Sequence, residues 1–150
     1  MYTTEQVSKQ RKKFWTTFGQ YMKPVPGTGT KVVNWLNYKT GIRNIFFRMD
    51  ADQQSAHVRI EILHSMEADR MHYYNHFVAL KKLLEKTSGT RWQWQAEVKD
   101  ENGQPISRIS QSLESVNILQ ESDWPAIITF LKEHITSLDV FWETVKDGFD

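Results

Sequence analysis

Residues 56 to 62 alternate strictly between apolar and polar side chains, and this alternation constrains the fold more than any other feature of the chain. The even-numbered positions are apolar and the odd-numbered ones polar, with Ala56, Val58, Ile60 and Ile62 set against His57, Arg59 and Glu61. Successive side chains of a β-strand point to opposite faces of its sheet. The segment therefore predicts a strand with one buried face, which other elements must cover.

Three longer segments carry apolar residues at the three- and four-residue spacing that is typical of amphipathic α-helices. They span residues 4 to 22, 67 to 86 and about 122 to 145. Gly89 follows the second segment as a helix cap, and Ser122-Asp123-Trp124-Pro125 favours a helix start at the third. We expect these helices to pack on the sheet.

Two hairpins are predicted in addition to the alternating strand. The first joins Lys31–Tyr38 to Ile42–Met49, and the second joins a strand containing Trp92, Trp94, Ala96 and Val98 on one buried face to the strand Pro105–Leu113. The fold class is thus α+β, with a mainly antiparallel sheet of about five strands packed by three helices. Its order is helix, three strands, helix, two strands, helix, and residues 1–150 form a single domain.

Composition excludes several classes of protein. The chain has no cysteine, which excludes disulfides, thiolate metal sites and cysteine nucleophiles. Hydrophobic residues make up 39% of it, enough for a folded core, but no window approaches the ~20 apolar residues of a membrane span. Charged residues interrupt the first 20 positions, unlike a signal peptide. We expect a cytoplasmic protein without membrane association.

The net charge of +1 hides a strong asymmetry along the chain. Residues 1 to 50 hold nine basic against two acidic residues, a net +7, and residues 101 to 150 hold three against nine, a net −6. Such a basic segment favours contacts with phosphate or an acidic partner. The predicted nucleic-acid-binding residues are Lys9, Arg11, Lys12, Lys13, Arg43 and Arg48.

The same asymmetry has two other interpretations. The terminal helices could lie side by side, so that the charges of Lys9, Lys12 and Lys13 are cancelled by those of Glu133, Asp139 or Glu143. Alternatively, the oppositely charged ends could join copies of the chain head to tail, as a structural, self-associating module.

The succession of helix, three strands, helix and strand resembles the core of the restriction-endonuclease-like nucleases. The resemblance implies Mg²⁺ or Mn²⁺ held by an acidic residue after the second strand and by a glutamate on the third. Asp50 or Asp52 and Glu61 occupy these positions, but Leu63 stands where the superfamily pattern has lysine. The other interpretation places both aspartates in a polar turn and leaves Glu61 in solvent or paired with an arginine.

Histidines offer a second arrangement with the spacing of metal ligands. Asp69, His72 and His76 fall near one face of the second predicted helix, and His64 precedes that helix. The catalytic pattern His-Glu-x-x-His is absent, and two such histidines are common on solvated faces.

Several short segments together resemble an uncharacterised bacterial family, catalogued as domain of unknown function 4268. They are Gly41-Ile42, Phe47-Arg48-Met49-Asp50-Ala51-Asp52, Ile60-Glu61-Ile62, Ile106-Ser107-Arg108-Ile109, Asp123-Trp124-Pro125 and Leu138-Asp139-Val140-Phe141-Trp142. The resemblance implies a bacterial domain that stands alone or follows other domains, some of them nuclease-like. It identifies no active site.

The sequence therefore favours a non-catalytic interaction domain, linked to nucleic acid or a DNA-acting system, over an enzyme. The alternatives are a divalent-metal-dependent nuclease or a degenerate relative of one, and the self-associating module. No cofactor is expected except Mg²⁺ or Mn²⁺ for the nuclease. The expected partner is nucleic acid or another protein.

Overall fold

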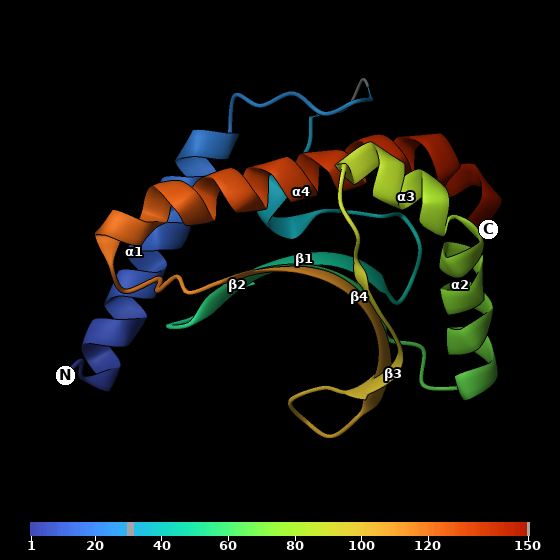
Figure 1. The fold of residues 1–150 in the computed structure, drawn as a ribbon, viewed down its shortest axis with the longest axis horizontal. Helices are drawn as coiled ribbons and strands as arrows, with labels where there is room; N and C mark the ends of the chain where they lie inside the picture. The colour runs from blue at the N-terminus through green and yellow to red at the C-terminus, as the bar shows by residue number, and fades with distance from the viewer. Residues whose placement is uncertain (30–31, 150) are drawn as a thin grey trace.

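A curved four-stranded antiparallel sheet with helices on its convex side forms the centre of the protein (Figure 1). The computed structural model describes residues 1–29 and 32–149. Its helices and strands are α1 (Thr4–Met22), β1 (Ile45–Ala51), β2 (Ser55–Ile62), α2 (Glu67–Ala79), α3 (Lys81–Ser88), β3 (Gln93–Lys99), β4 (Pro105–Glu114) and α4 (Trp124–Val145). Short 3-10 turns lie at Trp35–Asn37, Glu121–Asp123 and Lys146–Phe149.

The strands lie in the order β1-β2-β4-β3, and every neighbouring pair is antiparallel. The predicted α+β class with a mainly antiparallel sheet is confirmed. The predicted numbers of elements are wrong, because the described residues form four strands rather than five and four α-helices rather than three.

The missing strand is the first one predicted, Lys31–Tyr38. Lys31 lies outside the described residues, and the segment that follows forms a 3-10 turn in which the Asn34 side chain accepts a hydrogen bond from the Asn37 amide. Trp35 and Tyr38 are buried in the core and do not pair with a neighbouring strand. The observed hairpin joins β1 to β2, so the succession of helix, three strands, helix and strand is not formed.

The second predicted helix is also corrected, because Leu80 divides it into α2 and α3. Leu80 leaves the helical conformation, with φ −102° and ψ 10°, and its amide bonds to the Phe77 carbonyl at 2.9 Å. The two helices consequently point in different directions, α2 at the end of the sheet and α3 beside α4 (Figure 1). The predicted cap is confirmed, since Gly89 ends α3 with φ +75°.

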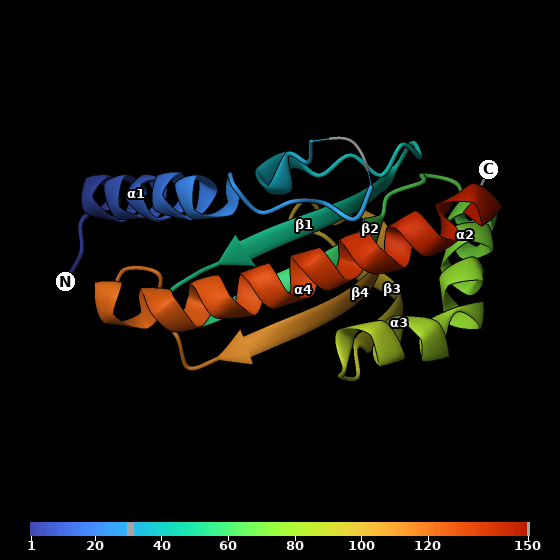
Figure 2. The same cartoon turned by 90° about the horizontal axis from the view of Figure 1, so that it is seen from above.

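The core lies between the convex face of the sheet and α4, which runs along it (Figure 2). The apolar side chains of the alternating segment in β2 are fully buried there, and Phe47 of β1 meets Trp142 of α4 with ring centroids 5.4 Å apart. Helix α1 joins this core through Phe14, whose ring lies 5.4 Å from that of Trp124. No helix among residues 1–29 and 32–149 is long and apolar enough to cross a membrane.

A β-bulge in β3 changes the face that was predicted to be buried. Trp94 pairs with Ile109 on the core face, but the register shifts between Gln95 and Val98, and Val98 pairs with Ile106 on the opposite face. Ala96 is exposed, and its carbonyl accepts a hydrogen bond from Ser107 Oγ at 2.6 Å. Of the four residues predicted to share a buried face, only Trp92 and Trp94 therefore pack with the core.

Candidate functional site

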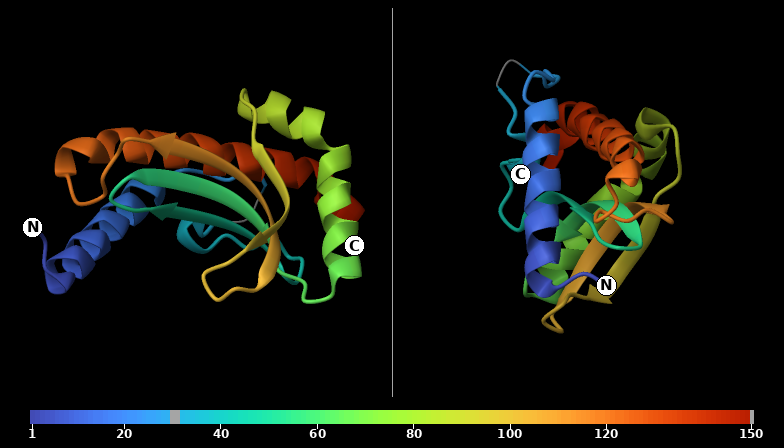
Figure 3. Two further views of the ribbon diagram at one scale, coloured as in Figure 1. Left: turned by 60° about the horizontal axis from the view of Figure 1, so that its bottom comes forward. Right: turned by 90° about the vertical axis from the view of Figure 1, so that its left-hand side faces the viewer.

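The concave face of the sheet, here called the open face, is the most distinctive surface of the protein. Among the described residues no helix lies over it, and α4 passes behind it (Figure 3, left). Its side chains come from all four strands: Phe46, Arg48 and Asp50 of β1, His57, Arg59 and Glu61 of β2, Arg108, Ser110 and Ser112 of β4, and Gln93 and Gln95 of β3. The apolar pair Val98 and Ile106 lies at one end of the face, and Ser55 with Glu114 lies at the other. The face between these ends is largely polar and contains three arginines.

The strand register arranges these side chains in three rows across the sheet. The first row is Phe46, Glu61, Arg108 and Gln95, the second is Arg48, Arg59, Ser110 and Gln93, and the third is Asp50, His57 and Ser112. Directly opposed residues on one face lie close enough to interact. The register therefore places Arg48, Arg59 and Arg108 in neighbouring rows of three adjacent strands.

Glu61 holds two of these arginines. Its Oε1 lies 2.9 Å from Arg48 Nη1, and its Oε2 lies 2.7 Å from Arg108 Nη2 and 2.9 Å from Arg108 Nε. The surrounding side chains leave Glu61 only 5% exposed, although no helix covers the face. Arg108 is thus bound through two of its nitrogens to one carboxylate oxygen, and Arg48 is bound to the other oxygen. The cluster fixes the positions of both guanidinium groups.

Arg48 also lies over the ring of Phe46, with its Cζ 4.4 Å from the ring centroid. This distance is within the range of a cation–π contact. Arg48 remains 48% exposed in spite of both contacts. An ordered cation therefore lies on the open face within reach of solvent.

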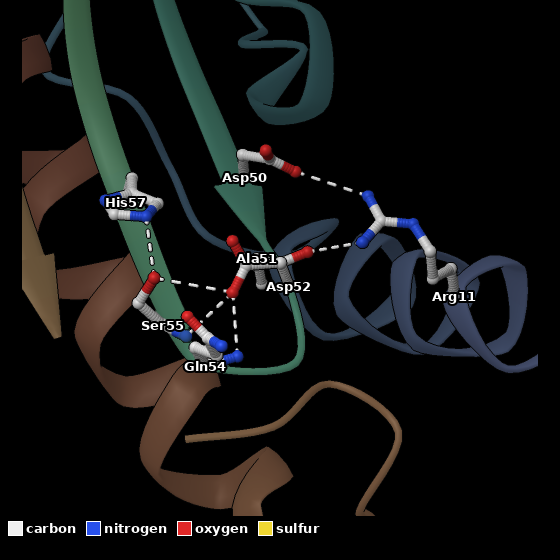
Figure 4. A network of polar contacts seen from close by, with 7 residues as sticks. All are labelled: Arg11, Asp50, Ala51, Asp52, Gln54, Ser55 and His57. Atoms are coloured by element: carbon white, nitrogen blue, oxygen red, sulfur yellow. Dashed lines mark hydrogen bonds and ion pairs between the residues drawn. The ribbon is translucent and has the colours of Figure 1, made fainter. Parts of the chain in front are cut away.

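The third row belongs to a hydrogen-bond network that surrounds the β1–β2 turn (Figure 4). His57 lies 2.8 Å from Ser55 Oγ through Nε2 and 2.8 Å from Ser112 Oγ through Nδ1. Burial, together with the positive charge of Arg59, lowers the pKa of His57 below its ordinary value of 6.5. The imidazole is therefore neutral at pH 7 and serves as a hydrogen-bonding group.

This network does not have the connections of a catalytic triad. The Asp52 carboxylate contacts Ser55 Oγ, at 3.4 Å, and both ring nitrogens of His57 contact serine hydroxyls. In a triad the carboxylate orients the imidazole, and the imidazole activates an accessible serine. Ser55 is buried. The arrangement is that of a turn and strand held together by polar side chains.

The three predicted metal ligands are each engaged separately. Asp50 Oδ1 lies 3.3 Å from Arg11 Nη2, Asp52 accepts the amides of Gln54 and Ser55, and Glu61 holds its two arginines. Partial burial acts to raise the pKa of Asp52, but the hydrogen bonds from those amides outweigh it and lower the pKa. Asp52 has the turn role that was the alternative interpretation.

The structure does not bring these carboxylates together. Asp50 pairs with His57 and Glu61 with Phe46, so the two acids are four residues apart along the strands. That separation corresponds to roughly 13 Å of extended chain. Across residues 1–29 and 32–149, no three His, Asp or Glu side chains lie close enough together to hold a metal ion. The predicted metal site at Asp69, His72, His76 and His64 is therefore not formed either. His64 stacks on Tyr73, and His76 stacks on Phe149.

The predicted basic residues lie in different places. Arg48 is on the open face, whereas Lys9, Lys12 and Lys13 are exposed on α1 and Arg43 is exposed before β1. Arg11 donates to the Ala51 carbonyl at 2.5 Å and pairs with Asp50, so it joins α1 to the end of β1 (Figure 4). The six residues do not form one surface.

The predicted cancellation of charge between the terminal helices is formed in a different way. Lys13 pairs with Glu121, just before α4, with the two charged atoms 3.2 Å apart. Asp139 accepts hydrogen bonds from the Tyr38 hydroxyl and the Thr28 amide, and Glu143 pairs with Lys146. The two acids are therefore committed to neighbours other than the α1 lysines.

Two residues of the open face were missed from the sequence as candidate site residues, Arg59 and Arg108. Arg59 is one of the polar residues of the alternating segment. Arg108 lies two residues before Ser110 and four before Ser112 in β4, so its side chain points to the same face as theirs. The alternation contained the signal, but the strand order that places β4 beside β2 could not be read from it.

Comparison with known proteins identifies a family but no relative of known structure. A family model described as "Domain of unknown function (DUF4268)" matches residues 10–146. No curated protein and no solved structure gives a significant match to the chain.

Proposed function

Since the chain belongs to the DUF4268 family, whose description names no activity, we propose its function from the open face: a non-catalytic interaction domain that binds nucleic acid there. The observation that carries the proposal is the row-by-row placement of Arg48, Arg59 and Arg108 on an uncovered sheet face. Arginine binds phosphate through several donors in fixed geometry. No cofactor is needed for this function.

The charges of the face support an anionic ligand. Glu61 neutralises one charge of the Arg48–Arg108 pair, and Asp50 is itself paired with Arg11. No ion pair of Arg59 is found within the part of the chain that the structure describes. Glu114, which pairs with Ser55 in the strand register, is a third acid of this face. With Arg11 counted, four arginines lie against three acids, and Arg59 is the residue best able to contact phosphate.

Binding of fluorescently labelled oligonucleotides, measured by anisotropy over a series of salt concentrations, tests the proposal. Affinity should fall steeply with salt, because phosphate contacts release counterions. Arg59→Ala should weaken binding and reduce the slope of log K against log salt by about 1. Arg59 is the preferred test because substitution of Arg48 or Arg108 would remove a partner from the buried Glu61.

Matched controls separate the open face from the rest of the molecule. Lys82→Ala removes the same charge from the exposed surface of α3, on the convex side of the sheet, and should leave binding unchanged. The double variant Lys9→Ala/Lys12→Ala removes exposed charges from α1. If that variant abolishes binding and Arg59→Ala does not, the interface lies on α1 and the proposal is wrong.

The described side chains give less support to the nuclease alternative, because Asp50, Asp52 and Glu61 are separately occupied. Bacterial origin and a cytoplasmic location remain predictions.

A further inference from the structure

We propose that Phe46 and Arg48 form a base-stacking position, so that the ligand of the open face is single-stranded nucleic acid. The inference rests on the proposed function and specifies its ligand. Phe46 is 37% exposed on a polar, uncovered face, and Arg48 lies over its ring. An aromatic ring beside arginine is the surface on which unpaired bases stack.

The packing of the core does not account for the position of Phe46. The adjacent Phe47 fills the core and is 4% exposed, whereas Phe46 points the other way and lies in a row with Glu61, Arg108 and Gln95. Its ring contacts Arg48, and the residue as a whole keeps 37% of its area exposed to solvent. An apolar ring at this position has surface available for a flat ligand.

Glu61 is the positioning residue for this arrangement. Its carboxylate engages Arg48 through Nη1 alone, which leaves the other N–H groups of that guanidinium for a ligand. Because Glu61 also holds Arg108, one buried acid orients two arginines, of which Arg48 lies over the Phe46 ring. A phosphate bound by Arg48 would therefore lie next to the Phe46 ring.

This geometry selects a single strand over a duplex. Bases of a duplex are stacked and paired in its interior, so their faces cannot reach a protein ring, whereas bases of a single strand can turn outward. Arg59 lies directly opposite Arg48 on the adjacent strand, in the row next to that of Phe46, and would contact a neighbouring phosphate. The extended sheet face, with Gln93 and Gln95 near the arginines, suits a strand laid across it.

The test compares Phe46→Ala with wild type for binding of oligothymidylate, oligouridylate and a blunt DNA duplex of equal length. Loss of one stacked base should weaken single-strand binding roughly 5- to 150-fold and leave duplex binding unchanged. Val140→Ala removes another half-exposed apolar side chain, from α4 on the convex side of the sheet, as a matched control. Phe46→Leu keeps the apolar volume without the aromatic ring, and thermal unfolding of each variant confirms that it is folded.

Photocrosslinking supplies a second readout. An oligonucleotide that carries 5-iodouracil should crosslink within the β1 peptide that contains Phe46, and Glu61→Gln should reduce this yield by releasing Arg48.

The outcomes separate the two proposals. If salt-sensitive binding depends on Arg59 but Phe46→Ala binds like wild type, the stacking position is refuted and the proposed function stands. Equal losses for single strand and duplex would also refute it. If no oligonucleotide binds at low salt, the proposed function fails as well.

Discussion

Asp139 is the residue that most clearly has an unexpected structural role. It is 3% exposed in the middle of α4, yet it carries a carboxylate. Its Oδ1 lies 2.5 Å from the Tyr38 hydroxyl and its Oδ2 lies 2.7 Å from the Thr28 amide. A buried acid requires such partners. Asp139 thus fastens two parts of the segment between α1 and β1 onto the last helix.

Tyr38→Phe should destabilise the protein at pH 7 by about 1–3 kcal/mol, because the substitution removes a hydrogen bond from a buried carboxylate. Equilibrium unfolding in urea measures this change in the free energy of unfolding. Tyr21→Phe, which removes the hydroxyl of an exposed tyrosine, should have little effect and serves as the control.

The same pair predicts a dependence on alkaline pH. Burial first, and then the hydrogen bond to Asp139, raise the pKa of Tyr38 above its ordinary value of 10.0. The stability that follows from this shift is fully present below pH 10 and declines as the pH rises further, because the unfolded chain ionises first. Tyr38→Phe should lose that part of the decline. An unchanged alkaline slope in this variant would contradict the assignment.

At the scale of the elements, the sequence predicted best where a local pattern and the tertiary structure agree. The alternation in β2 was identified because one buried face determines it, and the start of α4 because Pro125 suits the first turn of a helix. Residues 32 to 38 were mistaken for a strand, since the aromatic side chains Trp35 and Tyr38 serve core packing and Val32 is exposed. The break at Leu80 has no Gly or Pro to mark it, and arises where the chain turns from the end of the sheet toward α4.

The end of α3 is an element boundary that can be tested directly. A Cβ added at Gly89 would meet no atom within 4 Å, but φ is +75°, in the left-handed region. Gly89→Ala should therefore cost about 1–2 kcal/mol through backbone strain rather than a clash. Gly89→Asn should cost less, because asparagine tolerates this conformation. Urea unfolding distinguishes them, and an equal cost for both would point to a different cause.

At the scale of the whole molecule, the sequence predicted the class of the fold but not the candidate site. The predicted metal set required Asp50 and Glu61 to converge, and the antiparallel pairing of β1 with β2 places them in different rows. The arginine set was incomplete because Arg108 joins it through the β2–β4 ladder, between strands that are far apart in the chain. The face to which a side chain of a strand points can be read from the local alternation, whereas the neighbour of each strand is decided by the complete fold.

The strand order also sets the order in which the protein can fold. The β1–β2 and β3–β4 ladders close over short turns, but the central ladder joins Ile62 to Ser107 and Ser55 to Glu114, across roughly 50 residues of chain. Contacts between distant segments slow folding. Docking of two preformed hairpins along β2 and β4 should therefore limit the rate. In stopped-flow experiments, Ile109→Val in β4 should slow refolding, because it weakens the central ladder. Gly103→Ala strains the β3–β4 turn, where φ is +78°, and should also slow refolding, because that hairpin forms before docking.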